Sequence, residues 1–133
     1  MTNLVHYSLA NGVATLVLDD GKRNALSPQM LGQINAAFDR AEADRAIIIL
    51  TGREQVFSAG FDLKVMKSGP LNALRMLRAG YLLTARVLAY PYPVIVACNG
   101  HSLAMGVFLM LSADYVVGTR EDFKISANEV AIG

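Results

Sequence analysis

The chain has 133 residues, 53% of them hydrophobic and 17% charged, which is long enough for one domain with a core and too apolar for an intrinsically disordered chain. Its net charge of +1 gives no reason to expect nucleic acid or an acidic protein as a partner. The single cysteine, Cys98, excludes an internal disulfide and a cysteine metal site. The amino terminus lacks a signal-peptide pattern and no apolar run could span a bilayer, so we expect a cytoplasmic protein without a membrane segment.

The first elements predicted are a hairpin and a helix. Asn11-Gly12 joins the β-rich runs Val5–Leu9 and Val13–Leu18, and this dipeptide accepts the positive φ angles of a tight hairpin turn. Ser27-Pro28 predicts a helix start, with serine as the N-cap and proline in the first turn. Apolar residues at helical spacing then extend the helix to about Ala43.

The middle of the chain predicts a strand, a loop and two helices. The unbroken apolar run Ala46–Leu50 is typical of a strand covered on both faces, and a loop from Thr51 to Gly60 follows it. We expect a short helix over about Asp62–Lys67 and a long one over about Leu71–Ala89. The apolar face of the long helix is expected to consist of Leu74, Leu77, Tyr81, Ala85 and Leu88.

The last part predicts a buried strand at Val94–Cys98, an apolar helix at about Ala104–Ser112 and a strand at Tyr115–Gly118. Another strand is expected around Phe123–Ile125. Strands that alternate with helices indicate an α/β fold with crossover connections. Three loops that leave buried strands are therefore candidate sites, since ligands of α/β proteins bind there.

The first candidate loop is Phe57–Leu63, where small residues precede a helix start. Such a turn exposes backbone N–H groups that suit an oxyanion or a phosphate, although it also fits an ordinary glycine turn.

The second candidate loop is Asn99–Gly106. Gly100-x-Ser102-x-Ala104 is close to the pattern of a serine nucleophile elbow. That chemistry needs a later histidine, and the sequence has none beyond His101. We therefore interpret His101 and Ser102 as turn residues whose polar side chains have hydrogen-bond partners within the protein. The backbone N–H groups of this turn are the better candidates for a functional role.

The third candidate segment is Ser126–Val130, in which Glu129 stands among small and apolar residues. Desolvation raises the pKa of a carboxyl group in such surroundings, so that it can exchange a proton near neutral pH. An ordinary surface glutamate remains the alternative.

Taken in order, these segments resemble the crotonase (enoyl-CoA hydratase/isomerase) family across the whole chain. The resemblance is carried by the hairpin and by the segments 22–27 (KRNALS), 57–64 (FSAGFDLK), 93–115 (PVIVACNGHSLAMGVFLMLSADY) and 125–133 (ISANEVAIG). It implies a crotonase-like spiral of ββα units, of the ClpP/crotonase type, with residues 1–133 forming one acyl-CoA-binding core.

The resemblance also implies an oxyanion hole for the thioester oxygen, formed by the backbone N–H groups of Phe61 and Met105, with Glu129 as the catalytic acid and base. The residues expected to bind CoA or the acyl chain are Arg23, Ala25, Leu26, Ala59, Asp62, Leu63, Lys64 and Phe108. Coenzyme A belongs to the substrate, so we expect no separate cofactor and no metal.

Phe108 bears on which reaction is catalysed. Hydratases of the family usually carry two glutamates, and the first would fall at Phe108, two residues after Gly106. One glutamate can move a proton between two carbons but is poorly equipped to orient water. We therefore predict an enoyl-CoA isomerase that shifts a double bond, with hydration, thioester hydrolysis or non-catalytic acyl-CoA binding as alternatives. Ala104 and Met105 replace the glycines of most relatives, and Met105 is expected to narrow the pocket.

The resemblance implies further spiral turns and carboxy-terminal helices after Gly133, which close the site and build trimers. We expect that this carboxy-terminal helical part is absent from the present chain. The full-length form is expected to be a homo-oligomer, either a trimer or a dimer of trimers, without membrane or nucleic-acid partners.

Overall fold

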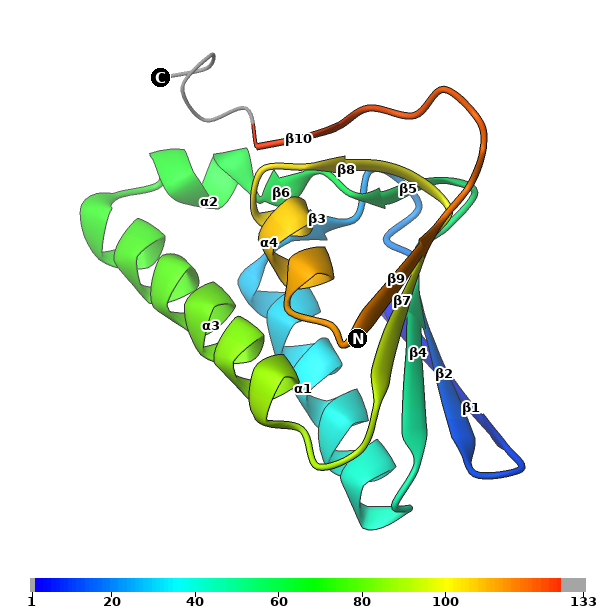
Figure 1. Ribbon diagram of the computed structural model, residues 1–133. Helices are drawn as coiled ribbons and strands as arrows, with labels where there is room; N and C mark the ends of the chain where they lie inside the picture. The colour runs from blue at the N-terminus through cyan, green and yellow to red at the C-terminus, as the bar shows by residue number, and fades with distance from the viewer. Residues whose placement is uncertain (1, 128–133) are drawn as a thin grey trace.

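The computed structural model of the chain describes residues 2–127. Its largest layer is a five-stranded sheet in the order β1-β2-β4-β7-β9 (Figure 1). The first two strands are antiparallel and all later neighbours are parallel. The five strands are β1 (Val5–Ala10), β2 (Val13–Leu18), β4 (Ile47–Thr51), β7 (Val94–Cys98) and β9 (Tyr115–Gly118).

A second layer of short strands crosses one end of the main sheet (Figure 1). Its three-stranded part has the order β10-β8-β5, and β3 pairs with β6 beside it. These strands are β3 (Ala25–Leu26), β5 (Gln55–Ser58), β6 (Gly60–Phe61), β8 (Gly100–Leu103) and β10 (Ile125–Ser126). Since β4 leads into β5 and β7 into β8, and a helix follows each pair, the chain repeats a ββα unit and confirms the predicted spiral.

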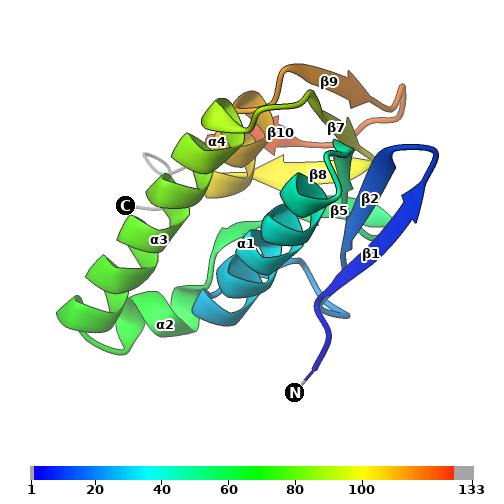
Figure 2. The ribbon, with the colours of Figure 1, turned by 90° about the horizontal axis from the view of Figure 1, so that it is seen from below.

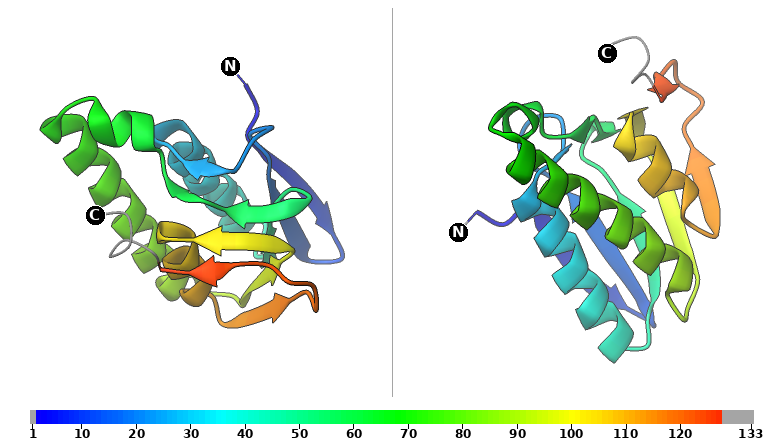
Figure 3. Two further views of the ribbon diagram at one scale, coloured as in Figure 1. Left: turned by 90° about the horizontal axis from the view of Figure 1, so that it is seen from above. Right: turned by 90° about the vertical axis from the view of Figure 1, so that its left-hand side faces the viewer.

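The helices cover one face of the main sheet (Figure 2; Figure 3, right). They are α1 (Pro28–Ala43), α2 (Leu63–Lys67), α3 (Pro70–Ala89) and α4 (Met105–Leu111). Side chains with no exposed surface, including Leu16, Ile48 and Val96 of the sheet and Ile34 and Phe38 of α1, fill the space between the layers. Burial of such side chains is the main stabilising term for a domain of this size.

Local sequence signals explain the first elements. Asn11 and Gly12 have φ angles of 52° and 76° at the hairpin turn, so both residues adopt the left-handed region that the sequence predicts. The Ser27 side chain accepts a hydrogen bond from the Met30 N–H and caps α1. The predicted hairpin and the predicted start of α1 are both confirmed.

The predicted apolar face of α3 is wrong. Leu74, Tyr81 and Leu88 are 62%, 56% and 70% exposed among the described residues. The buried face of this helix consists of Met76, Gly80, Leu83 and Val87. A Cβ on Gly80 would overlap the Phe61 ring, so the absence of a side chain there allows α3 to pack closely against Phe61.

Two other predictions need correction. The region Thr51–Gly60 is not only a loop, because it contains β5. The strand β4 is fully covered on one face only: Ile48 and Leu50 are buried, whereas Ile47 and Ile49 keep some exposure in the described part of the chain. Residues 2–127 contain no helix with the length and apolarity that crossing a bilayer requires.

Candidate active site

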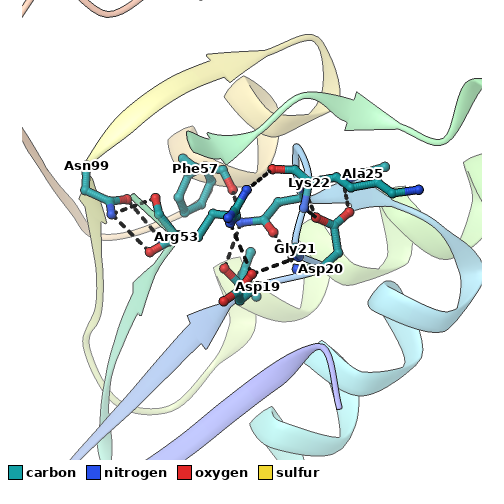
Figure 4. A network of polar contacts seen from close by, with 11 residues as sticks. Asp19, Asp20, Gly21, Lys22, Ala25, Arg53, Phe57 and Asn99 are labelled. Atoms are coloured by element: carbon teal, nitrogen blue, oxygen red, sulfur yellow. Dashed lines mark hydrogen bonds and ion pairs between the residues drawn. The ribbon is translucent and has the colours of Figure 1, made fainter. Parts of the chain in front are cut away.

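The loop between β2 and β3 is held by its own polar side chains (Figure 4). Asp20 Oδ1 accepts hydrogen bonds from the backbone N–H groups of Lys22 and Asn24, at 2.7 and 2.9 Å. The Asn24 side chain is buried and donates to the carbonyl oxygens of Leu18 and Phe57, at 2.7 and 3.1 Å. Asn24 has a φ of 53°, which asparagine tolerates better than most residues. The loop that carries Arg23 therefore has a defined shape.

Contacts from the β5–β6 segment fix the same loop from outside. The buried Ser58 hydroxyl donates to the Asn24 carbonyl oxygen at 2.7 Å, and the Ala59 N–H donates to the Arg23 carbonyl oxygen at 3.0 Å. Along the short parallel pair β3–β6, Ala25 lies opposite Gly60. The structure thus brings together Arg23, Ala25, Leu26 and Ala59, which the sequence assigns to CoA binding.

The two turns expected to supply backbone donors are in direct contact. A Cβ on Gly60 would lie 2.9 Å from the Ala104 Cβ and 3.2 Å from the Met105 nitrogen. Gly60 has a φ of 92°, so this close approach requires glycine on both counts. Met105 is the first residue of α4, and the first N–H groups of a helix have no acceptor within the helix. The Met105 N–H therefore lies beside the Gly60–Phe61 peptide.

The residue before Met105 adopts an unusual backbone conformation. Ala104 has φ 52° and ψ −124°, a combination that L-residues other than glycine seldom adopt and that costs about 1–3 kcal/mol. Its own N–H donates to the Ser126 carbonyl oxygen at 2.9 Å. The start of α4 is thus tied to β10, three residues before Glu129 in the sequence.

Apolar side chains pack beside these turns. The Phe61 ring packs edge-on against Tyr81 with ring centroids 6.4 Å apart. The Met105 side chain is 2% exposed and its Cε also approaches Gly80. Met105 thus packs against α3 in the core, and its expected effect on the size of the substrate pocket stays a prediction.

The start of α2 and the outer side of α4 hold the other expected contacts. Asp62 caps α2 by accepting hydrogen bonds from the Lys64 and Val65 N–H groups, while Leu63 and Lys64 are exposed. Phe108 of α4 is 41% exposed. The sequence has no Asp or Glu between Leu63 and Ala113, so α4 provides no carboxylate for catalysis.

A pocket of about 490 Å³ opens beside the β2–β3 loop. Its lining contains four Lys or Arg side chains and one acid, Glu54. The lining residues are Lys22, Arg23, Arg53, Glu54, Gln55, Val56, Ala59, His101, Leu103 and Lys124. Ala59 and Leu103 each lie next to one of the two contacting turns, so the pocket opens beside the residues that precede the candidate backbone donors.

The polar side chains of the Asn99–Gly106 turn have structural partners in part. His101 Nδ1 accepts a hydrogen bond from the Lys124 N–H at 2.9 Å, whereas the buried Ser102 hydroxyl has no partner among the described residues. Burial raises the pKa of the Cys98 thiol, which donates to the Gly100 carbonyl oxygen. Cys98 is therefore an uncharged core residue and not a nucleophile. Glu129 lies outside the described residues, so its predicted role as the catalytic acid and base stays a prediction.

The sequence analysis did not predict a cluster of polar contacts that joins the β4–β5 turn to Asn99 and to the β2–β3 loop (Figure 4). The Asn99 side chain donates to the Gly52 and Arg53 carbonyl oxygens, both at 3.0 Å, and accepts from the Gly52 N–H at 3.1 Å. The Arg53 side chain reaches Asp19 and Lys22. The Asn-Gly and Thr-Gly pairs after β7 and β4 each indicate a turn, but neither pair shows that the two turns meet in space. Residues 2–127 hold no cluster of three or more acid, histidine or cysteine side chains fit for a metal ion.

Comparison with known proteins agrees with this fold. The sequence profile of the enoyl-CoA hydratase/isomerase family matches residues 8–133. A putative enoyl-CoA hydratase of Thermus thermophilus is 38% identical over 128 residues, which cover 91% of this chain and 50% of the relative. Enoyl-CoA delta isomerase 3 of Arabidopsis thaliana is 29% identical, with 89% of this chain and 52% of the relative covered.

Solved structures give the same result. An enoyl-CoA hydratase/isomerase family protein from Pseudomonas syringae superposes with a TM-score of 0.96 at 52% identity, covering 98% of this chain and 56% of that protein. An enoyl-CoA isomerase of Mycobacterium tuberculosis superposes with a TM-score of 0.95 at 45% identity, covering 100% and 58%.

The chain belongs to the enoyl-CoA hydratase/isomerase family and has the crotonase fold. It spans about half the length of the relatives that it matches. The relatives include proteins named as hydratases and as isomerases, so the comparisons establish the family but not the individual reaction.

Proposed function

We propose that this chain provides the substrate-binding and oxyanion-forming half of an enoyl-CoA isomerase. The observation that carries the proposal is the contact between the turns at Gly60 and Met105. In the proposed reaction the Phe61 and Met105 N–H groups donate to the thioester oxygen. Two fixed donors stabilise the negative charge that develops when a proton leaves the neighbouring carbon, and loss of one such donor typically costs roughly 3 kcal/mol.

Glu129 is proposed to take that proton and return it two carbons further along the acyl chain. This shifts the double bond between positions 3 and 2 without adding or removing an atom overall. The bond between Ala104 and β10 supports this role, because it ties the oxyanion turn to the strand that leads to Glu129. A carboxyl group in an apolar pocket has the raised pKa that such a proton shuttle needs.

The lack of an acid on α4 favours isomerisation over hydration. A hydratase of this family needs a second carboxylate to orient water, and the corresponding position is Phe108, whose ring keeps 41% exposure among the described residues. Hydration is the second candidate because the Thermus relative and several others are named as hydratases.

Separate incubations with trans-2-hexenoyl-CoA and trans-3-hexenoyl-CoA test the proposal. An isomerase interconverts the two esters and forms little 3-hydroxyhexanoyl-CoA. Hydration of the 2-enoyl ester without interconversion would instead establish the second candidate. Chromatography with mass detection separates these outcomes, since water addition changes the mass and isomerisation does not.

A further inference from the structure

The Arg53 side chain joins two loops that are distant in sequence (Figure 4). Its Nη1 donates to the Lys22 carbonyl oxygen at 2.6 Å. Its Nε is buried and lies 3.1 Å from Asp19 Oδ1, close enough for an ion pair but without the alignment of a hydrogen bond. The β4–β5 turn thus holds the β2–β3 loop at both ends of the segment 19–22.

Asp19 serves this contact and the loop itself. Its Oδ1 also accepts a hydrogen bond from the Gly21 N–H at 2.8 Å. One oxygen therefore connects the guanidinium group of Arg53 to the backbone just before Lys22 and Arg23. Both of these cationic residues line the pocket described above, as Arg53 itself does.

We propose that Arg53, held by Asp19, is a positioning residue that fixes the Lys22–Arg23 loop for the phosphate-bearing end of an acyl-CoA. The inference rests on the proposed function, because it takes a CoA ester as the ligand. The Asp19 and Arg53 side chains are 41% and 35% exposed, and exposed ion pairs contribute little to stability. The role should therefore appear in ligand affinity and not in the free energy of unfolding.

Asp19→Asn distinguishes a positioning role of Arg53 from general electrostatic attraction of the ligand. The variant removes a negative charge near a polyanionic ligand, so long-range electrostatics alone predicts tighter binding. It keeps an oxygen for the Gly21 N–H but loses the ion pair with Arg53. If Arg53 positions the loop, binding becomes weaker. The two explanations thus predict opposite signs.

The chain contains a matched control pair. Arg86 Nη1 lies 2.6 Å from Asp39 Oδ1 and also donates to a backbone carbonyl oxygen, that of Asn35. This pair joins α3 to α1 and lines neither the cationic pocket nor the two contacting turns. Asp39→Asn and Arg86→Met therefore make the same chemical changes away from the loop.

The experiment is isothermal titration of the protein with hexanoyl-CoA and with hexanoyl-pantetheine, which lacks the nucleotide and its phosphates. We expect Asp19→Asn and Arg53→Met to raise the Kd for hexanoyl-CoA by about five- to tenfold, which corresponds to about 1–1.4 kcal/mol, and to leave the Kd for hexanoyl-pantetheine within about twofold. The double variant should bind like Arg53→Met alone, since the two residues act as a unit. The control variants should bind both esters like the wild type.

Tighter or unchanged binding of hexanoyl-CoA by Asp19→Asn would overturn the positioning role, and so would equal losses for both esters. If the wild-type protein bound neither ester, the proposed function would fail and this inference with it. That result is distinguishable because it is seen before any substitution is made.

Discussion

Gly60→Ala is the substitution to which the candidate site should be most sensitive. A Cβ at this position would lie 2.9 Å from the Ala104 Cβ and 3.0 Å from the Leu103 carbonyl oxygen. Alanine at a φ of 92° costs about 1–3 kcal/mol, and overpacking adds about 1–3 kcal/mol. We expect the free energy of unfolding to fall by about 2–6 kcal/mol. Because the added methyl group pushes the Phe61 and Met105 amides apart, catalysis should fall further than stability explains.

A second substitution, at Ala104, tests whether the overlap between the two turns causes this loss of stability. Ala104→Gly should by itself stabilise the protein by about 1 kcal/mol, because it relieves the backbone strain at Ala104. In the Gly60→Ala background it also removes the overlap of the two Cβ atoms, so the two changes should couple by at least about 0.5 kcal/mol. Urea unfolding with a fitted slope for each variant measures these values. A Gly60→Ala protein as stable as the wild type, or strictly additive changes, would refute the packing of the two turns.

Three further predictions concern the loop, a helix and an alkaline transition. Asn24→Gly keeps the positive φ but leaves two buried carbonyl oxygens without donors, so it should cost about 2–3 kcal/mol; thermal unfolding that matches the wild type would contradict this. Leu83→Ala on the buried face of α3 should lower the free energy of unfolding by about 2–5 kcal/mol, whereas Leu74→Ala should change it by no more than about 0.5 kcal/mol. A larger loss for Leu74→Ala than for Leu83→Ala would instead support the buried face predicted from sequence. Burial, and then the hydrogen bond to Asp44, raises the pKa of Tyr7 to about 12. Because the unfolded phenol ionises first, the free energy of unfolding should fall as the pH rises from about 10 to about 12. Tyr7→Phe should make this fall shallower in denaturant unfolding, and an unchanged pH dependence would exclude Tyr7 as its source.

The sequence predicted the elements whose signals are local. Asn11 and Gly12 adopt the two positive φ angles that their turn requires, and the Ser27 side chain caps α1. The turns at Gly60 and Met105 were recognised from motif and spacing, and the structure places them in contact. Their catalytic role, like that of Glu129, stays a prediction.

Features set by tertiary contacts could not be predicted in the same way. Leucines occur around most of α3, so periodicity alone could not show that Gly80 lies against Phe61 while Leu74 is exposed. The strand β5 is short and begins with an exposed glutamine at a φ of 67°, which gives it no strand pattern. The contact of Arg53 with the β2–β3 loop depends on two turns meeting in space, and no local sequence signal encodes that meeting.

In the proposed mechanism, one carboxyl group moves a proton while two backbone donors hold the thioester oxygen. The most direct test compares the wild-type protein with Glu129→Gln on trans-3-hexenoyl-CoA, following trans-2-hexenoyl-CoA by chromatography while titration monitors binding of hexanoyl-CoA. We expect the glutamine variant to bind the saturated ester like the wild type but to isomerise at least about a hundredfold more slowly, the usual scale of general acid–base catalysis. Isomerisation at an undiminished rate by Glu129→Gln would show that Glu129 does not move the proton.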